Sequence, residues 1–331
     1  MPGVRARRVR VGRRTVLRAA AGTGLLAATS PVAGCGRSGP DPRLTIGSGT
    51  RPGVYIRMAE VLADAWTERL DLTVRPEVLS TAGSVANMAL LRSGRAQLAI
   101  SQVDSTADYL ATLSPDAPVA PRALARLYDD VTHVVVSQDA PYRRLADLRG
   151  ARVSIGPAGS GYNTIARRLF DAAGIGVQGL GKIIELGLDE APSALAVGDL
   201  DAFFWSGGVP TDGIVELAGV HPIRLIDLSD VLSRVRANSD VYTISTVPAA
   251  TYRLPAPVST LSVRNVLVAT AAMPDDVAQM LVRTVFDEQP RLSAANPAAV
   301  TIDSRSAIGT QPIPLHPGAQ AFYRATKGYS G

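Results

Sequence analysis

The sequence predicts an α/β fold of two similar lobes built on mostly parallel sheets. Short apolar or β-branched runs alternate along the chain with segments of helical periodicity, a pattern typical of parallel sheets covered by helices. Two features also recur at nearly the same offset. The strand end and glycine-rich loop at 46–53 recur at 155–161, and the unit at 94–99 recurs at 198–203. Two lobes in register are the simplest account; the alternative is that any doubly wound fold gives echoes of this kind.

Each predicted strand is an apolar or β-branched run bounded by glycine, serine or proline, and each predicted helix repeats apolar residues three or four apart. We expect strands at 44–46, 72–79, 97–101, 131–137, 152–155, 183–186, 202–205 and 258–269, and helices at 54–70, 84–93, 162–173, 191–197, 275–286 and 319–325. The predicted lobes are residues 43–136 with 258–331, and residues 137–257. Hinge strands are expected near 134–137 and 258–268, where the chain crosses between the lobes.

Three glycine-rich loops, at 47–53, 80–84 and 156–161, each follow a predicted strand and open a predicted helix. In a parallel sheet such loops lie at the carboxyl ends of the strands, where ligands bind. Backbone N–H groups and helix N-termini favour anions there, and three serines add hydroxyl groups. We therefore expect a small anionic or carboxylate ligand. The alternative for any single loop is that glycine only permits the turn. The serines are Ser48, Ser84 and Ser160.

Several other residues are placed near these loops. Trp205 precedes the Gly207-Gly208 turn and lies at the end of a predicted strand. The sequence favours equally a position in the wall of a cleft and a position in the core. Tyr55 begins the first helix, and Asn87 lies one turn into the second. Arg51, in the first loop, is either a bidentate partner for a carboxylate or a solvated loop residue, and the solvated reading is favoured.

The sequence offers no catalytic, cofactor or metal site. The glycines of the first loop are spaced GxGxxxG rather than GxGxxG, and Tyr162 stands where a phosphate-binding loop needs lysine. No GxSxG motif of serine hydrolases is present. The three histidines, His133, His221 and His316, are far apart and lack metal-ligand spacing. We expect His133 and His316 to be structural.

The basic charge of the chain belongs to its N-terminal segment. The chain carries 34 basic and 29 acidic residues, a formal charge of +5. Seven arginines and no acid lie in residues 1–34, so the remainder has 27 basic and 29 acidic groups and a charge of −2. A nucleic-acid-binding protein is expected to have a basic face, so we do not expect nucleic acid as a partner.

Residues 1–34 have the layout of a signal peptide: a basic start, a weakly apolar stretch and a small-residue end. Arg13-Arg14 resembles a twin-arginine export signal, and residues 32–35 resemble a lipobox. Cys35 is the only cysteine, which excludes an intramolecular disulfide. We expect a lipid on Cys35 to anchor the protein to the outer face of the cell membrane, with residues 35–42 as a tether.

An ordered series of motifs resembles the TAXI family of extracytoplasmic solute receptors, which serve TRAP-type transporters. The motifs run from the first glycine-rich loop to the segment PIPLHPGA at 312–319, so they cover nearly the whole chain after the leader. The resemblance implies a type II periplasmic-binding-protein fold with a ligand cleft between the lobes. The ligand contacts it implies are Gly49, Tyr55, Ser84, Asn87, Ser160, Gly207 and Gly208.

The function implied by this resemblance is the capture of a small carboxylate for integral membrane transporter subunits. Characterised family members bind glutamate or related acids, so glutamate, glutamine or a dicarboxylate is the expected ligand. A ligand sensor that acts on a membrane signalling protein, without transport, is the alternative. An enzyme is disfavoured because no acid–base or nucleophile set is present.

Overall fold

The computed structural model describes residues 43–51, 53–114 and 116–328. The predicted signal peptide, Cys35 and the tether lie outside these residues. Within the described ranges, no helix has both the length and the apolar character needed to cross a membrane.

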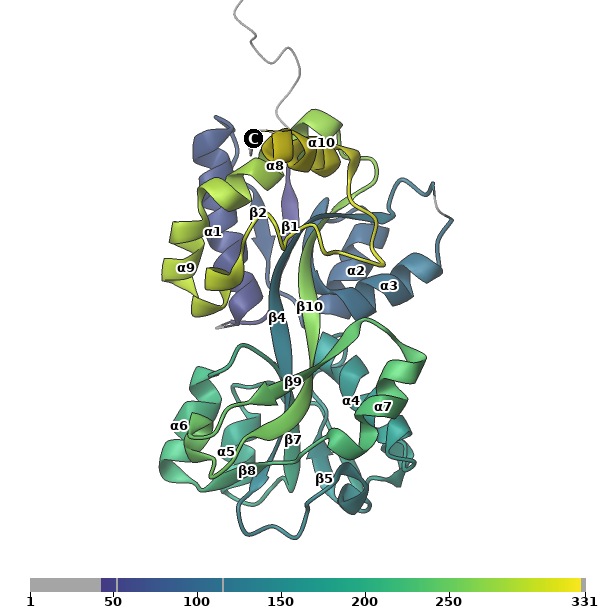
Figure 1. Ribbon diagram of the computed structural model, residues 1–331, viewed down its shortest axis with the longest axis vertical. Helices are drawn as coiled ribbons and strands as arrows, with labels where there is room; N and C mark the ends of the chain where they lie inside the picture. Colours follow the sequence, from purple (N-terminus) through teal and green to yellow (C-terminus); the bar gives the residue numbers. More distant parts are fainter. Residues whose placement is uncertain (1–42, 52, 115, 329–331) are drawn as a thin grey trace, which may run out of the picture. The chain divides into compact units, whose positions relative to one another are not determined.

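One mixed sheet of ten strands organises the described part of the chain, in the order β2-β1-β3-β10-β4-β7-β5-β6 (Figure 1). This order contains eight of the ten strands. The other two lie off this path: β8 pairs with β4, and β9 pairs with β10. The strands are β1 (Thr45–Gly47), β2 (Glu77–Leu79), β3 (Leu98–Gln102), β4 (Pro121–Ser137), β5 (Arg152–Ser154), β6 (Lys182–Ile184), β7 (Ala202–Gly207), β8 (Ile223–Leu225), β9 (Tyr242–Val247) and β10 (Val258–Thr270).

Helices cover the faces of this sheet. The α-helices are α1 (Val54–Arg69), α2 (Ser84–Arg92), α3 (Val103–Ala111), α4 (Gly161–Ala172), α5 (Ala191–Ala196), α6 (Asp212–Val220), α7 (Ser229–Asn238), α8 (Asp275–Asp287), α9 (Gln289–Ala295) and α10 (Pro317–Gly328). Short 3₁₀ turns lie at η1 (Leu145–Leu148), η2 (Val177–Gly179), η3 (Thr251–Arg253) and η4 (Pro297–Thr301).

The strands fall into two groups joined by β4 and β10, which run side by side through both (Figure 1). Lobe 1 denotes the elements from β1 to α3 together with α8, α9 and α10. Lobe 2 denotes the elements from β5 to β9. The first part of β4 pairs with β10, and its last part pairs with β7 from Val131 to Val136. In the same way β10 pairs with β9 up to Val263 and with β3 from Asn265 onward. The predicted two-lobed α/β fold is confirmed, whereas the residue boundaries of the lobes stay a prediction.

Apolar side chains of the described residues form three buried clusters. One lies in lobe 1 around Trp66, whose indole N–H donates to the Leu281 carbonyl at 3.2 Å. A second lies in lobe 2 around Phe203. The third includes Leu91 of α2 and Phe170 of α4, so it receives side chains from both lobes. Burial of this shared apolar surface favours contact between the lobes.

Most predicted elements lie within two residues of the observed ones, and the helix expected at 319–325 is longer, at Pro317–Gly328. Two predicted strands differ more. The strand expected at 72–79 is only Glu77–Leu79, because Asp71 has a positive φ of 49° and the chain turns before the strand begins. The strand expected at 131–137 is the last part of the much longer β4. The prediction missed α3, α6, α7, α9, β8 and β9.

Candidate functional site

The three glycine-rich loops meet where α1, α2 and α4 begin. The Ser80 hydroxyl donates to the Gly49 carbonyl at 3.1 Å, which joins the first two loops. The Ala86 N–H, in the first turn of α2, donates to the Gly159 carbonyl at 3.0 Å and joins the second loop to the third. The first N–H groups of a helix lack intrahelical partners, so these three N-termini bring free donors and partial positive charge to one place.

A small cavity of about 60 Å³ lies at this junction, lined by residues of both lobes. Gly49, Tyr55 and Ser84 line it from lobe 1, and Ser160 and Gly207 from lobe 2. Further lining residues include Gln102, Asp130, Gly161, Tyr162, Trp205 and Ser206. The structure therefore brings together five of the residues that the sequence placed in a ligand site, and Trp205 is a sixth.

A larger cavity of about 530 Å³ shares a wall with the small one. The shared residues are Thr50, Gly53, Val54, Tyr128 and Trp205. Gly208 lines this larger cavity, as do three arginines and three aspartates, so its charged groups balance. They are Arg51, Arg57, Arg126, Asp129, Asp189 and Asp212.

Tyr55 and Ser84 are joined in one hydrogen-bonded chain. The Tyr55 hydroxyl donates to the side-chain oxygen of Asn265 and lies 3.2 Å from the Ser84 hydroxyl. Because the single proton of Tyr55 is used in this way, Ser84 donates to the Tyr55 oxygen. Ser84 in turn accepts from the Gln102 backbone N–H at 3.0 Å. Burial raises the pKa of Tyr55 well above its ordinary value, so the hydroxyl stays protonated.

A buried carboxyl group, Asp130 on β4, also lines the small cavity. Its side chain is 3% exposed, and its Oδ2 accepts from the Gln102 side-chain amide at 2.8 Å. Burial raises the pKa of this carboxyl to about 6. Sequence reasoning placed neither Asp130 nor Gln102 in a ligand site. The available signal was an acid at a position where the alternation of a strand predicts a buried side chain.

Two predicted contact residues, Ser48 and Asn87, line neither of these cavities. The Ser48 hydroxyl donates to the Leu79 carbonyl at 2.7 Å. The Asn87 amide donates to the Ser48 and Ile100 carbonyls at 2.6 and 2.8 Å and accepts from Thr81. Both are fully buried. Their polar atoms are satisfied by neighbouring strands and loops, so they fix the loops in place instead of facing a ligand.

Ser160 has a structural role beside its place in the cavity wall. It is the N-cap of α4, where its hydroxyl accepts from the Asn163 N–H at 3.2 Å. Trp205 lines both cavities, donates its indole N–H to the Thr211 hydroxyl at 3.1 Å and packs edge-on against Tyr162. These contacts therefore support a position of Trp205 in the wall of a cleft.

The model for the NMT1-like family matches residues 46–326. The chain belongs to this family. Solved structures that it resembles include PhnD1 from Prochlorococcus marinus in complex with methylphosphonate, with a TM-score of 0.55, 12% identity, and coverage of 86% of this chain and 98% of that one. Another is XAC2383 from Xanthomonas citri bound to ATP, with a TM-score of 0.52, 16% identity, and coverage of 86% and 95%. This likeness confirms the two-lobed binding-protein fold.

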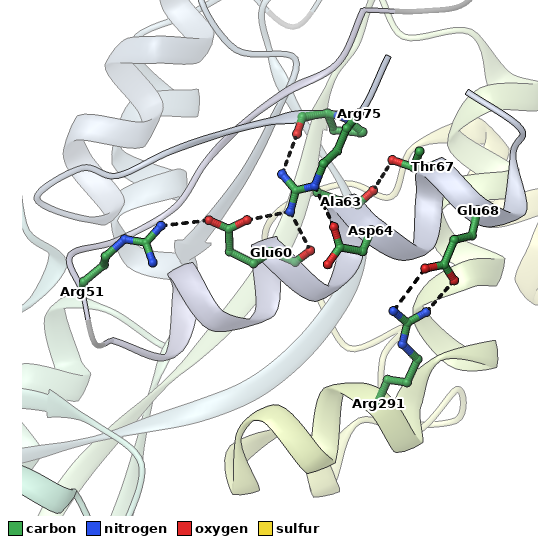
Figure 2. A network of polar contacts seen from close by, with 9 residues as sticks. Arg51, Glu60, Ala63, Asp64, Thr67, Glu68, Arg75 and Arg291 are labelled. Carbon is green, nitrogen blue, oxygen red and sulfur yellow. Dashed lines mark hydrogen bonds and ion pairs between the residues drawn. The ribbon is translucent and has the colours of Figure 1, made fainter. Parts of the chain in front are cut away.

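Arg51 of this NMT1-like chain lies in the loop before α1, and its side chain reaches Glu60 on that helix (Figure 2). Its guanidinium contacts Glu60 at 3.1 Å, and the side chain is 73% exposed. Arg75 contacts Glu60 and Asp64, both at 2.6 Å, so Glu60 joins the two arginines. This geometry fits the solvated reading of Arg51 better than a bidentate ligand contact.

The histidines of the described NMT1-like chain lie in separate environments. His133, on β4, is buried beside the Tyr252 hydroxyl at 3.1 Å, and burial lowers its pKa to about 4. His316 is buried, and its Nδ1 accepts from the Gly318 N–H. Both histidines are buried and contact groups of the protein itself, as expected for structural residues. Among residues 43–51, 53–114 and 116–328, no group of three His, Cys, Asp or Glu side chains is arranged to hold a metal ion.

Proposed function

We propose that this NMT1-like protein is an extracytoplasmic solute-binding protein that captures a small ligand between its lobes for import. The observation that carries the proposal is the small cavity at the junction of three helix N-termini, lined by residues of both lobes. Ligands of two-lobed α/β proteins bind at such strand ends. The chain has a family match over most of its length and resembles a binding protein solved with methylphosphonate.

Contacts across the cavity support capture by closure. The Gln102 side-chain amide on β3 donates to the Ser206 hydroxyl on β7 at 3.2 Å, and the Ala86 N–H on α2 donates to the Gly159 carbonyl. Both bonds join lobe 1 to lobe 2 beside the cavity. Bending of β4 and β10 would separate the lobes and admit a ligand, a hinge motion typical of binding proteins.

A carboxylate-bearing ligand fits the donors at this site. The proposed contacts are Gly49, Tyr55, Ser84, Ser160, Trp205, Gly207 and Gly208. Backbone N–H groups at the starts of α1, α2 and α4 stabilise negative charge without a partner arginine. No catalytic role is proposed, because the polar groups around the cavity lack a nucleophile activated by a base.

The ligand class is tested by a thermal-shift screen of the mature protein. Amino acids and dicarboxylic acids are compared with neutral sugars at equal concentration. A bound ligand raises the unfolding temperature, and the shift increases with concentration above its Kd. Stabilisation by acids supports the proposal, and stabilisation by sugars alone contradicts it.

We further propose that the protein is anchored by a lipid on Cys35 and works with integral membrane subunits of a TRAP-type transporter. Cys35→Ser is expected to move the protein from the membrane fraction to the soluble fraction and to remove the lipid mass from the N-terminus. Fractionation and intact mass spectrometry measure both changes. Retention of the variant in the membrane fraction would contradict the anchor. Loss of ligand uptake in a deletion strain separates transport from sensing.

A further inference from the structure

The small cavity contains an acid, although its helix N-termini favour an anion. Asp130 is almost fully buried, and its Oδ1 has no hydrogen-bond partner among the described residues. Burial of a carboxylate without a compensating partner is strongly unfavourable. A plain anionic ligand would increase that cost, so the acid calls for a different ligand group.

A second acceptor without a partner lies beside Asp130. The Gln102 side chain is 2% exposed, and its Oε1 has no partner among the described residues. The orientation of this amide follows from its contacts, because its nitrogen donates to Asp130 Oδ2 and to Ser206. A Cβ added at Gly161 would lie 1.8 Å from Gln102 Oε1. The oxygen therefore lies against the start of α4, and position 161 has no room for a side chain.

No positive charge of the described chain faces Asp130. The charged or titratable neighbours are Tyr55 on α1, with Tyr128 and Asp129 on β4. The side chains of Gln102 on β3, Asn265 on β10 and Tyr128 favour the charged form of Asp130 by hydrogen bonding, which lowers its pKa against the larger effect of burial, although the Asn265 amide nitrogen forms no hydrogen bond with Oδ1. None of these is a cation, and Asp130 forms no ion pair within the described ranges. The hydroxyl protons of Tyr55 and Ser84 are also committed elsewhere, as described above.

We propose that Asp130 Oδ1 and Gln102 Oε1 form a subsite for a protonated amine, so that the ligand is an amino acid rather than a simple carboxylic acid. This inference rests on the proposed function and narrows its ligand class. An ammonium group supplies the donors that both oxygens lack, and its charge compensates the buried carboxylate. The adjacent helix N-termini then hold the carboxylate of the same ligand.

The sizes of the two cavities agree with a ligand whose amino and carboxylate groups lie in the small cavity and whose side chain lies in the larger one. The small cavity has room for about four water-sized groups, which suits the head group of an amino acid. The larger cavity shares its wall with the small one and accommodates a side chain. Arg57 lines this larger cavity and forms no ion pair within the described ranges, so it is available to an acidic side chain.

The test compares matched ligand pairs by calorimetry at pH 7.5 on the mature protein. The pairs are L-glutamate with glutarate, L-glutamine with glutaramate, and L-leucine with 4-methylpentanoate. Each pair differs in the α-amino group. The variant Asp130→Asn keeps the acceptor for Gln102 but presents an amide N–H₂ where the ligand amine would lie. Asp64→Asn is the matched control, since Asp64 is half-exposed on α1 and contacts Arg75.

At least one amino acid is expected to bind the wild type roughly 10- to 100-fold more tightly than its partner without the amine, the range for a charge-assisted hydrogen bond. Asp130→Asn is expected to remove that difference, and Asp64→Asn to preserve it. Circular dichroism shows that each variant is folded. Equal binding of both pair members, unchanged amine preference in Asp130→Asn, or no binding by any amino acid would overturn the subsite. Carboxylic acids that bind without amine preference would leave the proposed function in place.

Discussion

Asp130 shows at the scale of one residue how a ligand site conflicts with stability. Its carboxyl group is buried without a cation, and burial raises its pKa from 3.8 to about 6. The native state therefore holds this proton more tightly than the unfolded chain. The protonated Asp130 carboxyl therefore contributes to the free energy of unfolding. This contribution is complete below about pH 4 and is lost as the pH rises through about 6. At neutral pH the folded protein contains a charge that a ligand compensates.

Asp130→Asn is expected to change the pH dependence of unfolding. The pKa shift corresponds to about 3 kcal/mol of unfolding free energy that the wild type loses between pH 4 and pH 7.5 and the variant does not. Urea unfolding of both proteins across this range measures the difference. Other titrating groups are common to both and cancel. A difference that does not vary with pH would show that Asp130 is ionised with an ordinary pKa in the native state.

Sequence reasoning found the donors of the site but not its acid. The loops were recognisable because glycine, serine and a following helix are adjacent in the chain. Asp130 and Gln102 lie on different strands and come together only because β10 pairs with both β3 and β4. No local pattern contains that register. The surroundings of Asn87 were hidden for a related reason. Its amide nitrogen donates to the Ser48 carbonyl, next to β1, and to the Ile100 carbonyl on β3, and neither contact can be inferred from its position on α2.

At the scale of single elements, strand β7 carries Trp205 near its end, and the fluorescence of this tryptophan can report on the site. Trp205 lines both cavities and packs against Tyr162 at the start of α4. The other tryptophan, Trp66, is fully buried in the core of lobe 1. Closure of the lobes or entry of a ligand changes the surroundings of the first and leaves the second unchanged.

Ligand binding is therefore expected to change the intrinsic fluorescence of the wild type, and Trp205→Phe is expected to abolish that change. Titration with the tightest ligand of the thermal-shift screen measures the signal. The matched variant Trp66→Phe is expected to retain it, with some loss of stability because a large buried side chain is reduced. A ligand-dependent signal that persists in Trp205→Phe would place the reporter elsewhere.

At the same scale, elements with strong local signals were predicted and those without were missed. Helices α1, α2, α4 and α8 repeat apolar residues on one face and begin near their predicted residues. Helix α3 was missed because Val103 continues directly from β3 with no intervening turn residue. The first part of β4 was missed because its two arginines and two aspartates interrupt the alternation, and its pairing with β10 is a contact that no local pattern shows.

At the scale of the whole molecule, a charged contact joins the two lobes away from the cavity. The Arg168 guanidinium on α4 contacts Asp104 at 3.3 Å and Asp108 at 2.5 Å, both on α3. The Tyr242 hydroxyl on β9 donates to Asp104 at 2.7 Å. Asp104 is buried, and burial raises its pKa. This contact exists only while the lobes are together, so it stabilises the closed form selectively.

Arg168→Gln is expected to favour the open form. Without ligand, small-angle X-ray scattering should give a larger radius of gyration than for the wild type. Ligand affinity should fall by roughly tenfold, because part of the binding energy is then used to close the lobes. Arg152→Gln is the control, since it breaks the Arg152–Asp201 pair within lobe 2. Equal dimensions and affinity in both variants would show that the contact does not control closure.

The path of the chain through the sheet also has a consequence for synthesis on the ribosome. Strand β3 pairs with β10, for example Ala99 with Val268, and the covering helices α8, α9 and α10 follow later still. While the nascent chain elongates, the first three strands therefore have an exposed edge and an uncovered apolar face. Edges of this kind pair with other chains. Strand β9 of lobe 2 also pairs with β10, but it is synthesised shortly before it, so the N-terminal strands wait longest for their partner and are the most exposed to pairing with other chains.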